Sequence, residues 1–143
     1  MDIPVNYLAV LACAVANMAI GFAWYGPLFG KKWSELMGWG PMTPEKMEEM
    51  KKKAMPGYAV SFVGALLMAY VLSRVLVFAT SYLQTSGWSA GLTSGFWMWL
   101  GFVAPVTVGV VFWDGKPWKL WFINAGYWLV SLLVMGVILA LWM

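Results

Sequence analysis

Histidine is absent from this sequence of 143 residues, and Cys13 is its single cysteine. One cysteine cannot form a disulfide within the chain, and without histidine the usual ligand clusters for zinc and related metals cannot form. There is also no phosphate-binding glycine loop and no nucleophile beside a general base. We therefore expect no metal site, no cofactor and no enzymatic activity.

Charged residues are scarce as well: they make up 10% of the chain, whereas hydrophobic residues make up 62%. Soluble domains carry roughly 25% charged residues. A soluble domain of this length could not bury so much apolar surface, so the composition predicts a membrane protein. The net charge of +3 is small, and we expect no nucleic-acid partner.

Four apolar stretches are long enough to cross a bilayer, which takes about 20 residues per helix. They cover residues 5–25, 58–83, 92–112 and 118–142. The fold class that follows is all-α: an integral membrane four-helix bundle, formed by a single transmembrane domain of residues 1–143.

The distribution of lysine gives the expected topology. All eight lysines lie in the connections at residues 27–57 and 114–119, and none lies at residues 84–91 or in the tails. By the positive-inside rule, the two lysine-bearing connections face the cytoplasm and both termini face outward. We expect a multi-pass protein of the cell membrane, in contact with membrane lipids.

The longer cytoplasmic loop contains a predicted helix start. Thr43 supplies a capping hydroxyl, and Pro44 suits the first helical turn. Met47, Met50 and Ala54 then recur on one face, with charged residues on the others. The pattern predicts a short cytoplasmic amphipathic helix that lies at the inner interface. Its lysines favour contact with lipid headgroups, and binding of a partner protein is the alternative.

The stretch Trp24, Tyr25, Gly26 and Pro27 marks the predicted exit of the first span. Proline and glycine end helices, and the aromatic pair suits a membrane–water boundary. We interpret this interfacial turn as architectural, or as a hinge at the cytoplasmic mouth.

Small residues recur at four-residue spacing in the predicted spans, which lets helix backbones approach each other in lipid. The spacing predicts that the first two spans form a tight pair and that the protein is a homo-oligomer. Whether the other stripes close a bundle or join subunits stays open. By span, the residues are Ala9, Cys13, Asn17 and Gly21; Gly57, Ser61, Ala65, Ala69 and Ser73; Gly87, Gly91 and Gly95; and Gly136 and Ala140.

Few polar side chains lie within the predicted spans. The candidates for an intramembrane polar site are Arg74, Asn17, Asn124 and Thr107. Arg74 is the only charged residue among them, and an intramembrane charge indicates a functional site by default. The structural alternative is that its side chain reaches outward to the headgroups or donates a hydrogen bond to Asn17.

The third span contains a predicted kink at Gly101 and Pro105. The proline ring cannot donate and displaces the carbonyl of Gly101, which Thr107 could satisfy. Freed carbonyls in lipid need a partner or a cavity, so the kink is either the wall of a pore or binding site or a kink without function. Three indoles lie away from the predicted boundaries and form either an aromatic cavity or packed core: Trp97, Trp99 and Trp128.

No aspartate or glutamate lies within a predicted span. Proton-coupled export of a cation normally needs a buried acid, so this absence disfavours that activity. Our leading hypothesis is a homo-oligomeric binding site or pathway for a small neutral or anionic solute. The alternative is a structural or interaction protein whose lysine-rich loop contacts lipid headgroups or a partner.

Several blocks of the sequence resemble one family of small prokaryotic four-span membrane proteins, grouped as domain of unknown function 1761. The resemblance implies a four-span architecture and the membrane of a prokaryotic cell, and it implies no known activity. The blocks are Tyr7-Leu8-Ala9-Val10, Trp24-Tyr25-Gly26-Pro27-Leu28-Phe29-Gly30-Lys31-Lys32-Trp33, Gly101-Phe102 and Phe122-Ile123-Asn124-Ala125-Gly126-Tyr127.

Overall fold

The computed structural model describes residues 3–39 and 43–142, and within these ranges it contains helices and no strand. Residues 40–42 of the predicted loop lie outside the described residues. Four helical segments are long and apolar enough to cross a membrane, which confirms the predicted all-α fold class. They are Tyr7–Leu28, Pro44–Leu83, Gly87–Phe112 and Trp118–Leu141.

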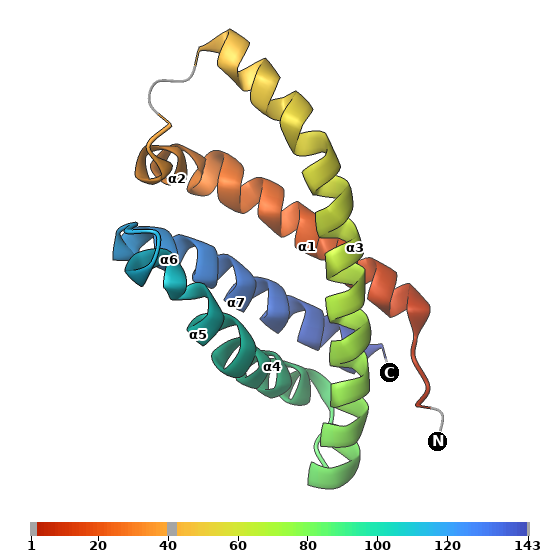
Figure 1. Cartoon of the computed structure of the whole chain (residues 1–143). Coiled ribbons are helices and arrows are strands. Elements are labelled where there is room, and N and C mark those ends of the chain that lie inside the picture. The colour runs from red at the N-terminus through yellow and green to blue at the C-terminus, as the bar shows by residue number, and fades with distance from the viewer. Residues whose placement is uncertain (1–2, 40–42, 143) are drawn as a thin grey trace.

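The two ends of the molecule differ, as Figure 1 shows. Both termini lie at one end, where the side-chain amide of Asn6 donates to the carbonyl of Trp142 at 2.8 Å. At the other end α2 lies beside the connection between α6 and α7, where the ammonium group of Lys116 donates to the carbonyl of Met37 at 3.4 Å. We call this second end the lysine end.

The first span is α1 (Tyr7–Ala23), and it continues into a wider π-helical turn, η1 (Trp24–Leu28). Pro27 lies inside η1, and the amide of Phe29 donates to the carbonyl of Trp24 at 2.8 Å. The prediction that Pro27 ends the helix is therefore wrong by one residue. The wider turn accommodates a residue without a donor, and the helix ends after Leu28.

The short helix α2 (Gly30–Met37) follows directly. Its first residue has no room for a side chain, because a Cβ on Gly30 would collide with the carbonyl oxygen of Tyr25. The left-handed backbone of Gly38, with φ of 77°, ends the helix. The chain therefore folds back on itself immediately after the first span.

The second span is part of one continuous helix of 40 residues, α3 (Pro44–Leu83). The Thr43 hydroxyl accepts from the amide of Lys46 at 3.3 Å, so the predicted helix start is confirmed. The predicted short amphipathic helix is not separate, because α3 runs through Pro56 without a break. Pro56 lies in an exposed stretch, where solvent can bond the carbonyl that it frees.

The third span is broken. It begins at Gly87, five residues before the predicted boundary at residue 92, and its π-helical turn comes directly before the helical segment that contains Pro105. The Thr107 hydroxyl donates to the carbonyls of Val103 and Ala104, at 2.7 and 3.3 Å, rather than to Gly101 as predicted. The segments are α4 (Gly87–Met98), η2 (Trp99–Val103), α5 (Ala104–Thr107) and α6 (Gly109–Phe112).

The fourth span, α7 (Trp118–Leu141), is the central helix and packs against α1, α3 and α4. Its closest approach is to α4: a Cβ on Gly91 would lie 2.5 Å from the carbonyl carbon of Gly136. A Cβ on Gly95 would lie 2.5 Å from the carbonyl oxygen of Leu132. Two of the predicted small-residue stripes therefore meet within one chain.

The predicted pairing of α1 with α3 holds over only part of α3. Ala65, Ala69 and Ser73 are buried, whereas Gly57 and Ser61, nearer the lysine end, are exposed. In Figure 1, α3 crosses α1 obliquely, and its first half rises away from the other helices. The half of α3 that carries the lysines is therefore open to its surroundings.

Candidate functional site

The candidate site starts where η1 packs against the start of α7, a contact that we call the seam. The Trp24 indole donates to the carbonyl of Ile123 at 2.9 Å, and the Tyr25 hydroxyl donates to the amide oxygen of Asn124 at 2.8 Å. A Cβ on Gly126 would lie 3.2 Å from the Trp24 ring, so the indole fits closely over this glycine. The seam holds the interfacial turn against the fourth span.

An open pocket of about 460 Å³ lies beside this seam, at the lysine end. It lies where the third span is interrupted between α5 and α6, because residues on both sides of this interruption line it. Its volume is within the usual range for small-molecule sites, roughly 300–1,000 Å³. We call it the polar pocket, and it is lined by Tyr25, Val106, Thr107, Gly109, Val110, Trp113, Asp114, Asn124 and Trp128.

Hydroxyl and amide groups give the polar pocket its chemistry. The Thr107 hydroxyl accepts from the Trp121 indole at 3.1 Å while it donates to its own helix. The amide oxygen of Asn124 accepts from Tyr25, which leaves the amide nitrogen of Asn124 to donate. Asp114 supplies the single carboxylate among the described residues of the lining, and no lysine or arginine is among them. The pocket lining therefore combines neutral hydrogen-bonding groups with a single carboxylate.

A buried polar cluster lies deeper, between α1 and α7. The Tyr127 hydroxyl lies 3.1 Å from the amide oxygen and 3.2 Å from the backbone carbonyl oxygen of Asn17, which is 2% exposed. The Tyr127 ring also packs edge-on against Tyr25, with 5.3 Å between centroids. Ser131, one turn further along α7, has a buried hydroxyl without a hydrogen-bond partner among the described residues. These contacts connect the pocket wall to the interior of the bundle.

Arg74 lies apart from this pocket. Its guanidinium group donates to the Tyr70 hydroxyl and lies 5.4 Å from the centroid of the Tyr70 ring. Because Tyr70 is one turn earlier in α3, the side chain points along the span toward the lysine end. The structure therefore shows neither the outward orientation nor the hydrogen bond to Asn17 that we considered.

The three indoles that we considered as a cavity are not gathered in one place. Trp97 is 60% exposed on the outer surface of α4. The Trp99 indole donates to the carbonyl of Ala125 at 2.8 Å and so helps to fix the third span on the fourth. Among these indoles, Trp128 alone lines the polar pocket.

Sequence reasoning missed two features of the site. Tyr127 was taken for part of a family-like block, although a tyrosine one turn before Ser131 could have suggested a polar helix face. Asp114 lies in the predicted connection at residues 114–119 and Trp113 directly follows the predicted third span, yet both belong to the pocket lining. Only the path of the broken helix reveals the second feature.

Together these observations define the class: a multi-pass helical membrane protein with four candidate membrane-spanning helices and a polar pocket at one end. A family model described as a protein of unknown function (DUF1761) matches residues 8–140, and the chain belongs to this family. No curated protein and no solved structure matches the chain. Two of the blocks that carried the resemblance meet in the seam between Trp24, Tyr25 and Asn124.

Proposed function

We propose that this protein binds a small neutral, hydrogen-bonding solute in the polar pocket, as one step of its passage across the membrane. The observation that carries the proposal is the break in the third span after Pro105, which opens a pocket lined by hydroxyl, amide and indole groups. Broken helices in membrane proteins line cavities, because irregular backbone is not tolerated against lipid.

The charge of the pocket lining supports a neutral solute rather than an anionic one. The hypothesis of an anionic solute depended on Arg74, whose side chain bonds Tyr70 outside the pocket. Asp114 would repel an anion that entered the pocket. A neutral solute can instead bond the Asn124 amide, and the Thr107 oxygen can accept from it.

Flux through proteoliposomes, with glycerol and urea as neutral probes and nitrate as the anion, tests the proposal. We expect faster glycerol or urea entry than in empty liposomes, and no faster nitrate entry. Thr107→Val should slow this entry, because it removes the pocket hydroxyl and leaves an isosteric methyl group.

Thr93→Val is the matched control, because Thr93 is exposed near the other end of the same span. Its hydroxyl also donates to the carbonyl four residues earlier, at 2.8 Å. Equal flux in the wild type, Thr107→Val and Thr93→Val would refute the role of the pocket. Nitrate flux that is present in the wild type and lost in Arg74→Ala would show instead that the protein carries an anion.

A further inference from the structure

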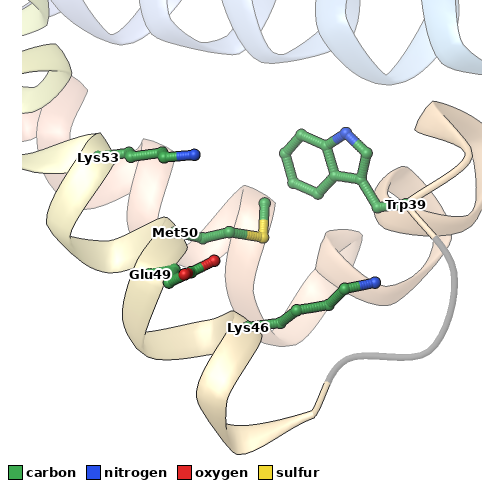
Figure 2. A pocket seen from close by; sticks show the side chains of 5 residues that line it. All are labelled: Trp39, Lys46, Glu49, Met50 and Lys53. Carbon is green, nitrogen blue, oxygen red and sulfur yellow. The ribbon is translucent and has the colours of Figure 1, made fainter.

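A second cleft lies outside the polar pocket, between Trp39, two residues after the end of α2, and the first turns of α3. Its volume is about 270 Å³. Figure 2 shows the side chains from α3 extending toward the indole that faces them. We call it the Trp39 cleft, and it is lined by Trp39, Lys46, Glu49, Met50 and Lys53.

Helical spacing explains why α3 presents these residues together. Glu49 and Met50 follow Lys46 by three and four residues and precede Lys53 by four and three, so the four residues share one face. An apolar side chain, Met50, thus lies between two ammonium groups. Lys51 and Lys52, on the same turns, do not line the cleft.

The position of Trp39 is fixed by the fold around it. Its amide donates to the carbonyl of Ser34 at 3.2 Å, across the left-handed turn at Gly38. Its ring packs edge-on against Trp33, with 4.7 Å between centroids. Trp33 in turn packs against Tyr25 at 5.3 Å. These contacts hold the Trp39 indole in place as one wall of the cleft.

The lysine charges that face the cleft have no partner within residues 3–39 and 43–142. Lys46 and Lys53 are exposed, and neither ammonium group makes a hydrogen bond or ion pair among the described residues. Glu49 supplies one negative charge, so the cleft as a whole is positive. An anion that accepts hydrogen bonds from both ammonium groups would supply the partners that they lack.

The position of the cleft along α3 indicates where such an anion would come from. Lys53 and Lys46 precede the boundary residue Tyr58 by five and twelve residues, or roughly 7.5 and 18 Å of helix. Because α3 runs obliquely to the other helices (Figure 1), both lysines lie closer to the boundary than these lengths. The headgroup layer extends about 5–8 Å beyond the hydrocarbon on each side. Exposed apolar side chains flank the cleft: Met47 is 46% and Met55 is 66% exposed. A phospholipid offers this combination, because its phosphate is anionic and its acyl chains are apolar.

From this combination we propose that the Trp39 cleft binds the headgroup of one anionic phospholipid from the leaflet at the lysine end. The phosphate lies between Lys46 and Lys53, and the glycerol region packs on Trp39 and Met50. Glu49 weakens the binding, because its carboxylate faces the same cleft as the phosphate. The site is separate from the polar pocket and does not depend on the proposed solute.

Native mass spectrometry of the purified full chain, titrated with phosphatidylglycerol or phosphatidylcholine in detergent, tests this proposal. We expect one phosphatidylglycerol to bind in preference to phosphatidylcholine. A lysine near an anionic surface contributes about fivefold in affinity. The double variant Lys46→Gln and Lys53→Gln should therefore bind phosphatidylglycerol roughly 25-fold more weakly.

The matched control is the double variant Lys51→Gln and Lys52→Gln, which removes the same charge from another face of α3. It should retain binding within about threefold, less than the effect of one surface lysine. Glu49→Gln should strengthen binding, which no loss of folding can imitate. Single Lys46→Gln and Lys53→Gln variants provide the same comparison if the double variant does not fold.

Three results would overturn the proposal. Equal losses in both double variants would show a diffuse charge effect without a defined site. Unchanged phosphatidylglycerol binding in Lys46→Gln and Lys53→Gln would show that the cleft is not occupied. Displacement of the lipid by inorganic phosphate at the same concentration would make free phosphate the ligand.

Discussion

Replacing Gly91 by alanine should destabilise the protein more than a glycine-to-alanine change on an open helix face. The new Cβ would lie 2.5 Å from the carbonyl carbon of Gly136 and 2.8 Å from the amide nitrogen of Val137. Non-bonded carbon atoms prefer about 3.5–4.0 Å. Since both neighbours belong to the backbone of α7, no side chain can rotate away. The helices α4 and α7 must therefore separate by about 1 Å.

The magnitude follows from this separation. A gap of about 1 Å forfeits as much as half of each dispersion contact across the helix pair. Overpacked cores lose about 1–3 kcal/mol, and we expect the upper end because the whole α4–α7 contact shifts. Alanine regains about 0.5–1 kcal/mol of helix preference over glycine. The net loss is then about 2 kcal/mol, or roughly 4–8 °C in the unfolding midpoint for a chain of this size.

The assay is thermal unfolding in one detergent at a fixed heating rate, followed by circular dichroism. Gly64→Ala is the matched control, because Gly64 lies in a helix and a Cβ there would meet nothing within 4 Å. It should be neutral or slightly stabilising. If Gly91→Ala and Gly64→Ala shift the midpoint equally, then α4 and α7 are not in backbone contact and the packing described above is wrong.

Two further predictions concern the polar cluster and the topology. Tyr127→Phe should lower stability by about 1–3 kcal/mol in the same thermal assay, because it leaves the buried Asn17 oxygen without its donor. The control is Tyr82→Phe, at a tyrosine that is 86% exposed, which should leave the stability unchanged. Equal effects of the two substitutions would refute the contact between Tyr127 and Asn17. In a Cys13→Ala background, Lys51→Cys should react with an impermeant maleimide only from the cytoplasmic side and Ser86→Cys only from outside, whereas the reverse pattern would invert the predicted topology.

The large features of the fold could be predicted because each depends on local composition. The length of each apolar run predicted four spans, and the cap at Thr43 predicted the start of a helix. The continuity of α3 could not be predicted, because the effect of Pro56 depends on whether the freed carbonyl meets water or lipid. A sequence shows the proline but not the depth at which it lies.

The candidate site depends on contacts that no local pattern contains. Tyr25 and Asn124 are 99 residues apart, and their hydrogen bond exists only because α7 packs beside η1. Pro105 correctly indicated a break in the third span, but the partners of Thr107 depend on the exact path of that break. Arg74 was the most conspicuous polar residue in the sequence, yet its guanidinium bonds a neighbour on its own helix.

Because α3 is unbroken, it should be stiffer than the segmented third span. At 40 residues it is a rod of about 60 Å that carries Lys46 and Lys53 near one end and Arg74 in its other half. The third span, by contrast, is divided into shorter segments by one π-helical turn, η2, and by a break at Val108. A force on the lysine-bearing end of α3 would therefore tilt the whole rod, while the third span would yield by bending.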